Sequence, residues 1–334
     1  MKTEVYSLMK GKIESVQMMR GIAALSVVIC HLGILKGREV DADGYFGVDL
    51  FFCISGFIMM FVTEKSCDGF LFKRFLRICP LYYLLTIAAF ATAFIAPHLL
   101  RDASTEFDAL ARSFFFIGGN DIMVGVGWTL CYEMFFYGLF FIAFKINHKN
   151  RHIISTAFLA ILVLAGIIFE PENAYLNFYT RPILLEFALG MFAYKILYHS
   201  KIYNSNNAYM QYVCLLLAII VYTSLFFITF DADRLFSAGI PTFVAFLLFF
   251  KALENKKMTK PLIILGNISY SLYLTHTFVI TISQKLLWDI EPEITFSSVA
   301  VSLFAVSMTI VTAYISWYLI ENKLTEWIRV KLKK

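Results

Sequence analysis

The sequence predicts an all-α fold, a polytopic membrane bundle of about ten transmembrane helices. Composition is the first observation: of 334 residues, 59% are hydrophobic and 16% are charged, and the mean hydropathy is +0.71. A soluble domain has roughly 45–50% apolar and 25% charged residues, so much of this apolar surface must face lipid. The other two observations are the lengths of the apolar runs and the charges of the loops between them.

Ten apolar runs have about the 20 residues that an α-helix needs to cross a bilayer. They cover residues 14–35, 44–63, 80–98, 126–145, 152–170, 180–198, 209–230, 235–251, 262–287 and 296–320. A shorter run around Phe114–Ile117 cannot cross and is expected to be re-entrant or interfacial. The spans use nearly the whole chain, so residues 1–334 are expected to form a single transmembrane domain.

The loop charges support the same count, because Lys and Arg are enriched in cytoplasmic loops. Every second loop is basic, as in Lys73, Arg74 and Arg77, in Lys145, Lys149 and Arg151, and in Lys251, Lys256, Lys257 and Lys260. The loops between them are acidic or mixed, as in Asp41 and Asp43, in Glu170 and Glu172, and in Asp289, Glu291 and Glu293. A missed span would reverse this pattern downstream. The sequence therefore predicts that both termini are cytoplasmic.

The six cysteines give no sign of a metal site. They are scattered, mostly within apolar runs, without a C-x-x-C pair or a His/Cys spacing that suits zinc. We expect them to be small core residues.

Two ionisable residues lie in the first span, where they are costly and usually face the bundle interior or a cavity. Arg20 and His31 are 11 residues apart, which corresponds to about 1100° of helix rotation and about 16 Å of axial rise. Both side chains should therefore share one face, with Arg20 in the inner third of the bilayer and His31 in the outer third. The structural alternatives are that Arg20 snorkels to the inner headgroups and that His31 is a packing residue with satisfied hydrogen bonds.

Three carboxylates are predicted at about the depth of His31. Asp49, Glu133 and Glu186 lie in the second, fourth and sixth spans, all of which should begin near the outer face. An Asp49–His31 pair would fix the histidine tautomer and raise its basicity. Alternatively, Asp49 is an N-terminal helix residue stabilised by the helix dipole, and Glu186 forms a structural pair with Arg181.

Two further clusters have both a structural and a functional interpretation. In the ninth span, Ser269, Tyr273 and His276 have the spacing of one helix face, which suits either an interhelical hydrogen-bonding seam or the lining of a site. The basic group at residues 73–77 suits either anionic lipid and the topology signal or phosphate binding through arginine. The sequence contains no Gly-rich phosphate loop, HExxH or G-x-S-x-G motif.

Five motifs follow one another along the chain. Residues 19–31 read MRGIAALSVVICH, residues 47–57 read GVDLFFCISGF and residues 73–82 read KRFLRICPLY; residues 128–137 read WTLCYEMFFY and residues 269–276 read SYSLYLTH. In this order they resemble the signature segments of the acyltransferase-3 family of integral-membrane O-acyltransferases, including its Arg–(10 residues)–His first span. The chain departs from the family at Cys53 and Cys79, where a branched aliphatic residue is more usual. The short chain resembles the branch that decorates exopolysaccharide or O-antigen.

The resemblance implies a multi-pass protein of a bacterial-type inner membrane. It implies transfer of an acyl group, usually acetyl, from cytoplasmic acyl-CoA to a sugar hydroxyl of a lipid-linked or nascent glycan. Acetyl-CoA would be a co-substrate, and no permanently bound cofactor, metal or nucleic-acid partner is expected.

The resemblance also implies roles for the polar residues. Arg74 and Arg77, with Lys73, would bind the CoA phosphates, and Arg20 would lie along the route of the pantetheine arm. His31 would be the general base or a transient acyl carrier, oriented or polarised by Glu133 or Asp49. The residues expected to bind substrate are Ser269, Tyr270, Tyr273, His276 and Glu186. The candidates for stabilising an oxyanion are Tyr270, Ser269 and Ser55.

Two competing functions use the same residues. In a transporter or flippase, Arg20, His31, Glu133 and His276 would line a substrate or proton path, although the sequence shows no inverted repeat. A membrane sensor or scaffold without activity is the other alternative. The set of motifs favours the enzyme.

Overall fold

The computed structural model describes residues 2–32, 46–97, 104–199, 207–227, 233–254, 256, 258–287 and 296–331. Within these ranges the chain forms helices and no strand, which confirms the predicted all-α class. Several of the charged loop residues used to orient the spans, among them Asp41 and Asp289, lie outside the described residues. The orientation of the termini therefore stays a prediction.

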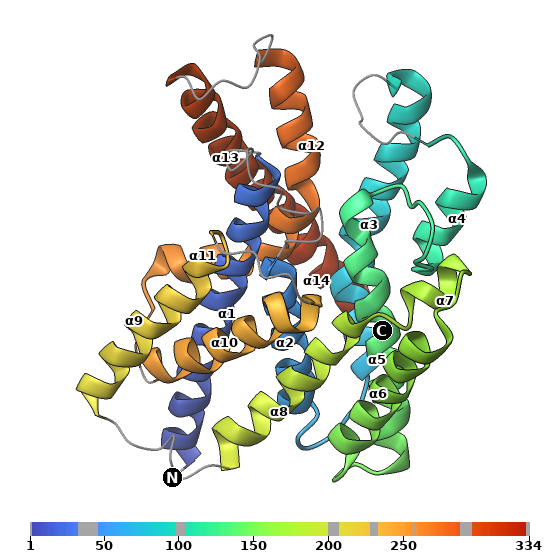
Figure 1. The fold of residues 1–334 in the computed structure, drawn as a ribbon. Coiled ribbons are helices and arrows are strands. Elements are labelled where there is room, and N and C mark those ends of the chain that lie inside the picture. The colour runs from blue at the N-terminus through green and yellow to red at the C-terminus, as the bar shows by residue number, and fades with distance from the viewer. Residues whose placement is uncertain are drawn as a thin grey trace.

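The centre of the molecule is built around α1 (Lys2–His31) and α2 (Phe46–Val62), which Figure 1 shows running through the middle of the bundle. On one side, α2 packs against α8 (Leu185–His199). On the other, α1 packs against α11 (Lys260–Asn267) and α12 (Ser269–Leu287). The residues that the sequence predicts to be functional lie mainly on these central helices.

Two glycines let α2 and α8 approach closely. A Cβ atom on Gly56 would lie 2.1 Å from the carbonyl oxygen of Phe187, and one on Gly190 would lie 2.0 Å from the carbonyl oxygen of Cys53. Both distances are far too short for a side chain, so glycine is required at the crossing. Small residues serve the same purpose in membrane helix pairs generally.

The third helix differs from its predicted form. The span was expected to begin at Pro80, but α3 (Phe70–Ile95) begins ten residues earlier and contains Pro80 in its interior. The basic residues at positions 73–77 consequently lie on the first turns of a helix. The helix determines the direction in which each of their side chains points. The short helix α4 (Phe107–Phe115) contains the first two residues of the apolar run that was predicted not to cross.

The remaining helices follow the predicted spans, except a short helix at residues 174–178, which lies between the spans predicted at 152–170 and 180–198. They are α5 (Trp128–Ile146), which follows the 3₁₀ turn η2 (Gly125–Gly127), α6 (Arg151–Phe169), α7 (Ala174–Phe178), the 3₁₀ turn η3 (Pro182–Leu184) before α8, and α9 (Ala208–Ser224). Figure 1 shows α5, α6 and α7 on one flank of the central helices and α9 on the other.

Three spans predicted as regular helices are interrupted or change their winding. The ninth is divided at Ile268 into α11 and α12, which are bent by 68°; here a Cβ on Gly266 would lie 2.1 Å from the carbonyl oxygen of Gln17 on α1. Before α10 (Ile240–Ala252) lies a π-helical turn, η5 (Leu235–Gly239). A second π-helical segment, η6 (Trp317–Leu324), joins α13 (Phe296–Ser316) to α14 (Thr325–Lys331).

Length and composition support a multi-pass membrane protein. Among the described residues, five helical segments can cross a membrane, and the bent pair α11–α12 would make a sixth; α2 and α9 are apolar but have only 17 residues each. The outer face of α6 shows the expected lipid-facing surface, with Ile161, Leu164 and Ile168 exposed by 56–70%. Ten crossings remain a prediction.

Candidate active site

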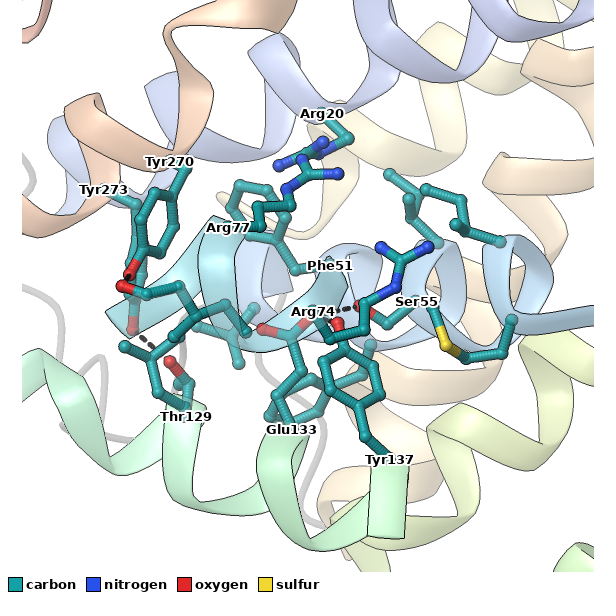
Figure 2. Close-up of a pocket in the computed structure, with 17 residues that line it drawn as sticks. Arg20, Phe51, Ser55, Arg74, Arg77, Thr129, Glu133, Tyr137, Tyr270 and Tyr273 are labelled. Carbon is teal, nitrogen blue, oxygen red and sulfur yellow. Dashed lines mark hydrogen bonds between the residues drawn. The ribbon is translucent and has the colours of Figure 1, made fainter. Parts of the chain in front are cut away.

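A narrow cavity lies among α1, α2, α3, α5 and α12, near the centre of the bundle. Its volume, taken as the space open to the centres of water molecules, is only about 50 Å³. Such a slot suits an extended, unbranched chain better than a bulky ring. Figure 2 shows that charged and aromatic side chains from separate helices point into it.

Three arginines supply positive charge to this cavity. Arg20 comes from the middle of α1 and is only 8% exposed, while the half-buried Arg74 and Arg77 come from the first turns of α3. The Arg74 guanidinium lies 5.8 Å from the ring centroid of Tyr137 and 5.9 Å from that of Phe70, so aromatic faces hold it in place. The spacing of Arg74 and Arg77, three residues apart on a helix, places both on one face.

One carboxylate balances part of this charge. Glu133 on α5 accepts hydrogen bonds at Oε1 from the hydroxyl of Ser55 at 2.8 Å and from the hydroxyl of Tyr137. Glu133 is the single acidic residue among the residues that line the cavity, against three arginines. The cavity therefore favours an anion with more than one negative charge.

Among the described residues, Glu133 accepts hydrogen bonds from two cavity residues, Ser55 and Tyr137. Its expected role in orienting His31 stays a prediction. Ser55 was a candidate for stabilising an oxyanion, and in this arrangement its hydroxyl is used to orient Glu133.

Two tyrosines of α12 close one end of the cavity. The Tyr270 hydroxyl donates to the carbonyl oxygen of Ile78 on α3 at 2.6 Å. The Tyr273 hydroxyl lies 2.8 Å from both the carbonyl oxygen of Val126 and the hydroxyl of Thr129. Both tyrosines were expected to bind substrate, and both line the cavity. Their hydroxyls fasten α12 to α3 and to the start of α5.

His31 and His276 form a direct pair one turn beyond Tyr273. The Nε2 atom of His276 lies 3.3 Å from Nδ1 of His31, and the two rings meet edge to face with centroids 4.6 Å apart. Nδ1 of His31 lies 2.9 Å from the carbonyl oxygen of Val27, and Nδ1 of His276 lies 2.5 Å from that of Tyr273. The sequence placed both histidines in the site, but it did not predict that they touch.

These contacts select one tautomer for each neutral ring. A carbonyl oxygen only accepts, so the proton of each histidine belongs on Nδ1. The Nδ1–H of His31 is then shared between the carbonyl oxygen of Val27 at 2.9 Å and the bare Nε2 of His276 at 3.3 Å. Nε2 of His31 is left as its unprotonated nitrogen. His276, which is fully buried, thus orients the ring of His31 from behind.

Asp49 has a different partner from the one predicted. Its carboxylate accepts two hydrogen bonds from Arg234, at 3.2 Å from Nε to Oδ1 and 3.0 Å from Nη2 to Oδ2. Asp49 is fully buried, and the Arg234 side chain is 18% exposed. The predicted Asp49–His31 pair is therefore wrong: a bidentate arginine, whose planar fork matches a carboxylate, takes up both oxygens.

Glu186 lies in the same buried region and outside the cavity. It is fully buried, its carboxyl group lies against that of Asp49, and a Cβ on Gly239 of the π-helical turn would lie 3.2 Å from Oε1. Its proposed partner Arg181 is exposed and donates instead to the side chain of Asn177 at 3.2 Å. Substrate binding by Glu186 is not supported by this position.

Two other predicted site residues also lie outside the cavity lining. The exposed Lys73 donates from Nζ to the carbonyl oxygen of Asp68 at 2.9 Å, while its neighbours Arg74 and Arg77 face inward. Ser269 is fully buried, and its hydroxyl has no hydrogen-bond partner. Sequence reasoning missed Arg234 and Tyr137. Tyr137 carried a signal, because it is four residues from Glu133 and shares its helix face.

Comparisons with known proteins agree on one family. A family model described as an acyltransferase domain, Acyl_transf_3, matches residues 13–321. The exopolysaccharide production protein ExoZ of Rhizobium meliloti is 32% identical over 260 residues, which cover 72% of this chain and 78% of that protein. The putative acetyltransferase ORF330 of Acidianus two-tailed virus is 25% identical over 81% of this chain and 84% of its own length.

A third relative is longer than this chain. The O-acetyltransferase OatA of Staphylococcus aureus is 26% identical over 91% of this chain, but the match covers only 56% of OatA. No solved structure matches the chain.

Proposed function

The chain belongs to the acyltransferase-3 family and is an O-acetyltransferase, and from that premise we propose that it moves the acetyl group of acetyl-CoA to a sugar hydroxyl of a lipid-linked or nascent glycan. The similarity to ExoZ, an exopolysaccharide production protein, supports a polysaccharide acceptor. A cytoplasmic donor fits a multi-pass protein of a bacterial cytoplasmic membrane. Acetyl-CoA is a co-substrate in this account.

The observation that carries the proposal is the set of three arginines around one narrow cavity. Arg20, Arg74 and Arg77 line it together, and guanidinium groups bind phosphate through a rigid fork of donors. CoA combines several phosphates with a thin pantetheine arm. The positive charge of the cavity suits the phosphates, and its narrowness suits the pantetheine arm. We assign Arg74 and Arg77 to the phosphates and Arg20 to the arm.

His31 is the group we assign to the chemical step. Its unprotonated Nε2 takes the proton of the acceptor hydroxyl as that oxygen attacks the thioester carbonyl. The carbon–sulfur bond then breaks, and the proton passes from His31 to the departing CoA sulfur. His276 is a positioning residue, because it holds Nδ1 of His31 and does not itself reach the substrate. Direct attack by His31 on the thioester, with a transient acyl-histidine, uses the same nitrogen.

Labelled acetyl transfer tests the proposed function. The full-length protein in membrane vesicles receives acetyl-CoA labelled in the acetyl group and de-O-acetylated glycan from the host cell. We expect alkali-labile label on the glycan. Absence of label on glycan with active wild-type vesicles would overturn the function. Solute uptake that depends on His31 without transfer would favour the transporter.

Removing a cavity arginine should weaken donor binding. We expect Arg77→Ala or Arg74→Ala to raise the KM for acetyl-CoA by about tenfold or more, since a charge-assisted hydrogen bond is worth about 1.5–3 kcal/mol. The KM for the glycan should change little. The measurement is initial rate against acetyl-CoA concentration in vesicles with matched protein content.

Lys73→Ala is the matched control, because Lys73 lies on the same helix, carries the same charge and points away from the cavity. It should leave the acetyl-CoA KM within about twofold of wild type, as expected for an exposed charge. If Lys73→Ala and Arg77→Ala change KM equally, the basic group acts through membrane charge and does not hold the donor.

A further inference from the structure

A second pocket lies on the other side of the first turn of α5. It is formed where the loop after α4 meets the segment of α7 and the residues that follow it, and its water-accessible volume is about 380 Å³. This volume is within the range of roughly 300–1,000 Å³ found for small-molecule sites. The sequence predicts both loops on the outer side of the membrane, opposite the predicted donor side.

The walls of this pocket are fixed. The backbone N–H of Gly118 donates to the Tyr179 hydroxyl at 3.1 Å, and that hydroxyl donates to the carbonyl oxygen of Phe116 at 3.2 Å. Gly119 has φ +109°, and a Cβ there would lie 2.8 Å from the carbonyl oxygen of Ala174. Only glycine fits that close approach and that backbone conformation. The two loops therefore form one rigid rim.

The side chains that line the pocket combine two aromatic rings, of Trp128 and the buried Phe178, with several planar polar groups. Trp128 is half-buried and lines the pocket, together with the exposed side chains of Asn120, Asp121, Asn177 and Arg181. Arg181 donates from Nε to Oδ1 of Asn177 at 3.2 Å, which orients both groups. An indole ring suits the C–H face of a sugar, and amide, carboxylate and guanidinium groups suit its hydroxyls.

The pocket is connected to the active site through α5. Trp128 is followed by Thr129, which lines the donor cavity and lies 2.8 Å from the hydroxyl of Tyr273. Tyr273 in turn contacts the ring of His276, with centroids 5.8 Å apart. Adjacent residues of α5 thus line the two pockets. A sugar in the outer pocket would be a neighbour of the reacting sugar.

We propose that this pocket, formed around Trp128, Asp121 and Asn177, is an acceptor subsite that binds a carbohydrate unit next to the one that is acetylated. The inference rests on the proposed function and deepens it. Binding there holds a longer glycan in place, so the subsite affects the KM for the acceptor and leaves the chemical step unchanged. Glycan fragments that are too short to reach the subsite gain no affinity from it.

The test uses full-length protein in vesicles and a length series of de-O-acetylated glycan fragments from the host cell. We expect Trp128→Ala to raise the KM for the longer fragments by about three- to tenfold, the effect of one aromatic contact. The KM for the shortest accepted fragment and for acetyl-CoA should stay unchanged. Asn177→Ala should act in the same direction, and its side chain is exposed, so folding is not at risk.

Trp327→Ala provides the matched control, because Trp327 is 56% exposed on α14, away from this pocket. Unchanged acceptor KM in both Trp128→Ala and Asn177→Ala would overturn the subsite. A lower amount of Trp128→Ala protein with unchanged KM would show that Trp128 only anchors the helix at the interface. Binding of a fluorescent fragment without acetyl-CoA separates the two proposals: if it binds wild type through Trp128 but receives no acetyl group, the function fails and the subsite stands.

Discussion

Replacing His31 with glutamine should lower kcat for acetyl transfer by about 10²–10⁴-fold, the usual contribution of a positioned general base. The KM for acetyl-CoA should change little, because His31 does not line the cavity that holds the arginines. Glutamine keeps a donor near the carbonyl oxygen of Val27 but has no basic nitrogen. The measurement is the rate of labelled transfer at saturating donor and acceptor.

Three histidine variants serve as references for this result. His148→Gln should keep wild-type activity, because His148 is exposed and its ring contacts the carbonyl oxygen of Thr63 and the ring of Phe144, neither of which lines the cavity. His276→Gln should retain more activity than His276→Ala, since its side-chain oxygen can still accept from Nδ1 of His31. Equal losses in the two His276 variants would argue against a positioning role. Wild-type kcat in His31→Gln would refute His31 as the base.

Loss of Arg234 should destabilise the fold strongly. Arg234→Ala removes both hydrogen bonds to Asp49 and leaves a fully buried carboxylate without its cation. Breaking a buried ion pair in this way costs about 3–5 kcal/mol, so we expect a much lower unfolding temperature in detergent. The measurement is thermal unfolding of the purified full-length protein.

Arg234→Lys is the matched variant, because it keeps the charge and loses the planar fork. Its unfolding temperature should lie between those of wild type and Arg234→Ala. An unchanged unfolding temperature in Arg234→Ala, together with a loss of kcat as large as that of His31→Gln, would contradict a structural role. The Asp49–Arg234 pair would then belong to the chemistry.

Much of the fold could be predicted because apolar runs and the bilayer length define helices locally. The start of α3 was mispredicted, since Pro80 suggested a helix start, whereas the structure continues the helix through it. The break at Ile268 was also missed. It depends on the contact between Gly266 and the backbone of α1 at Gln17, which no pattern within the ninth span reveals.

The candidate site was likewise predicted in part. Helix periodicity correctly placed Arg20 and Tyr273 toward one interior, because the spacing along a helix determines the face, whereas Tyr270 was expected from the family resemblance. Partner choice was less predictable: Asp49 and Arg234 are 185 positions apart, and His31 and His276 are 245 apart. Similar depth in the membrane allowed Asp49 to pair with His31, but only packing could show that Arg234 takes that position.

The proposed acetyl transfer requires that acetyl-CoA binds in the cavity lined by the three arginines. The most direct test is an experimental structure of the full-length protein in lipid nanodiscs with a non-hydrolysable acetyl-CoA analogue. We predict that its phosphates contact Arg74 and Arg77, that its pantetheine arm passes Arg20, and that its acetyl group lies beside His31. An analogue bound outside this cavity, or with its acetyl group remote from His31, would contradict the account.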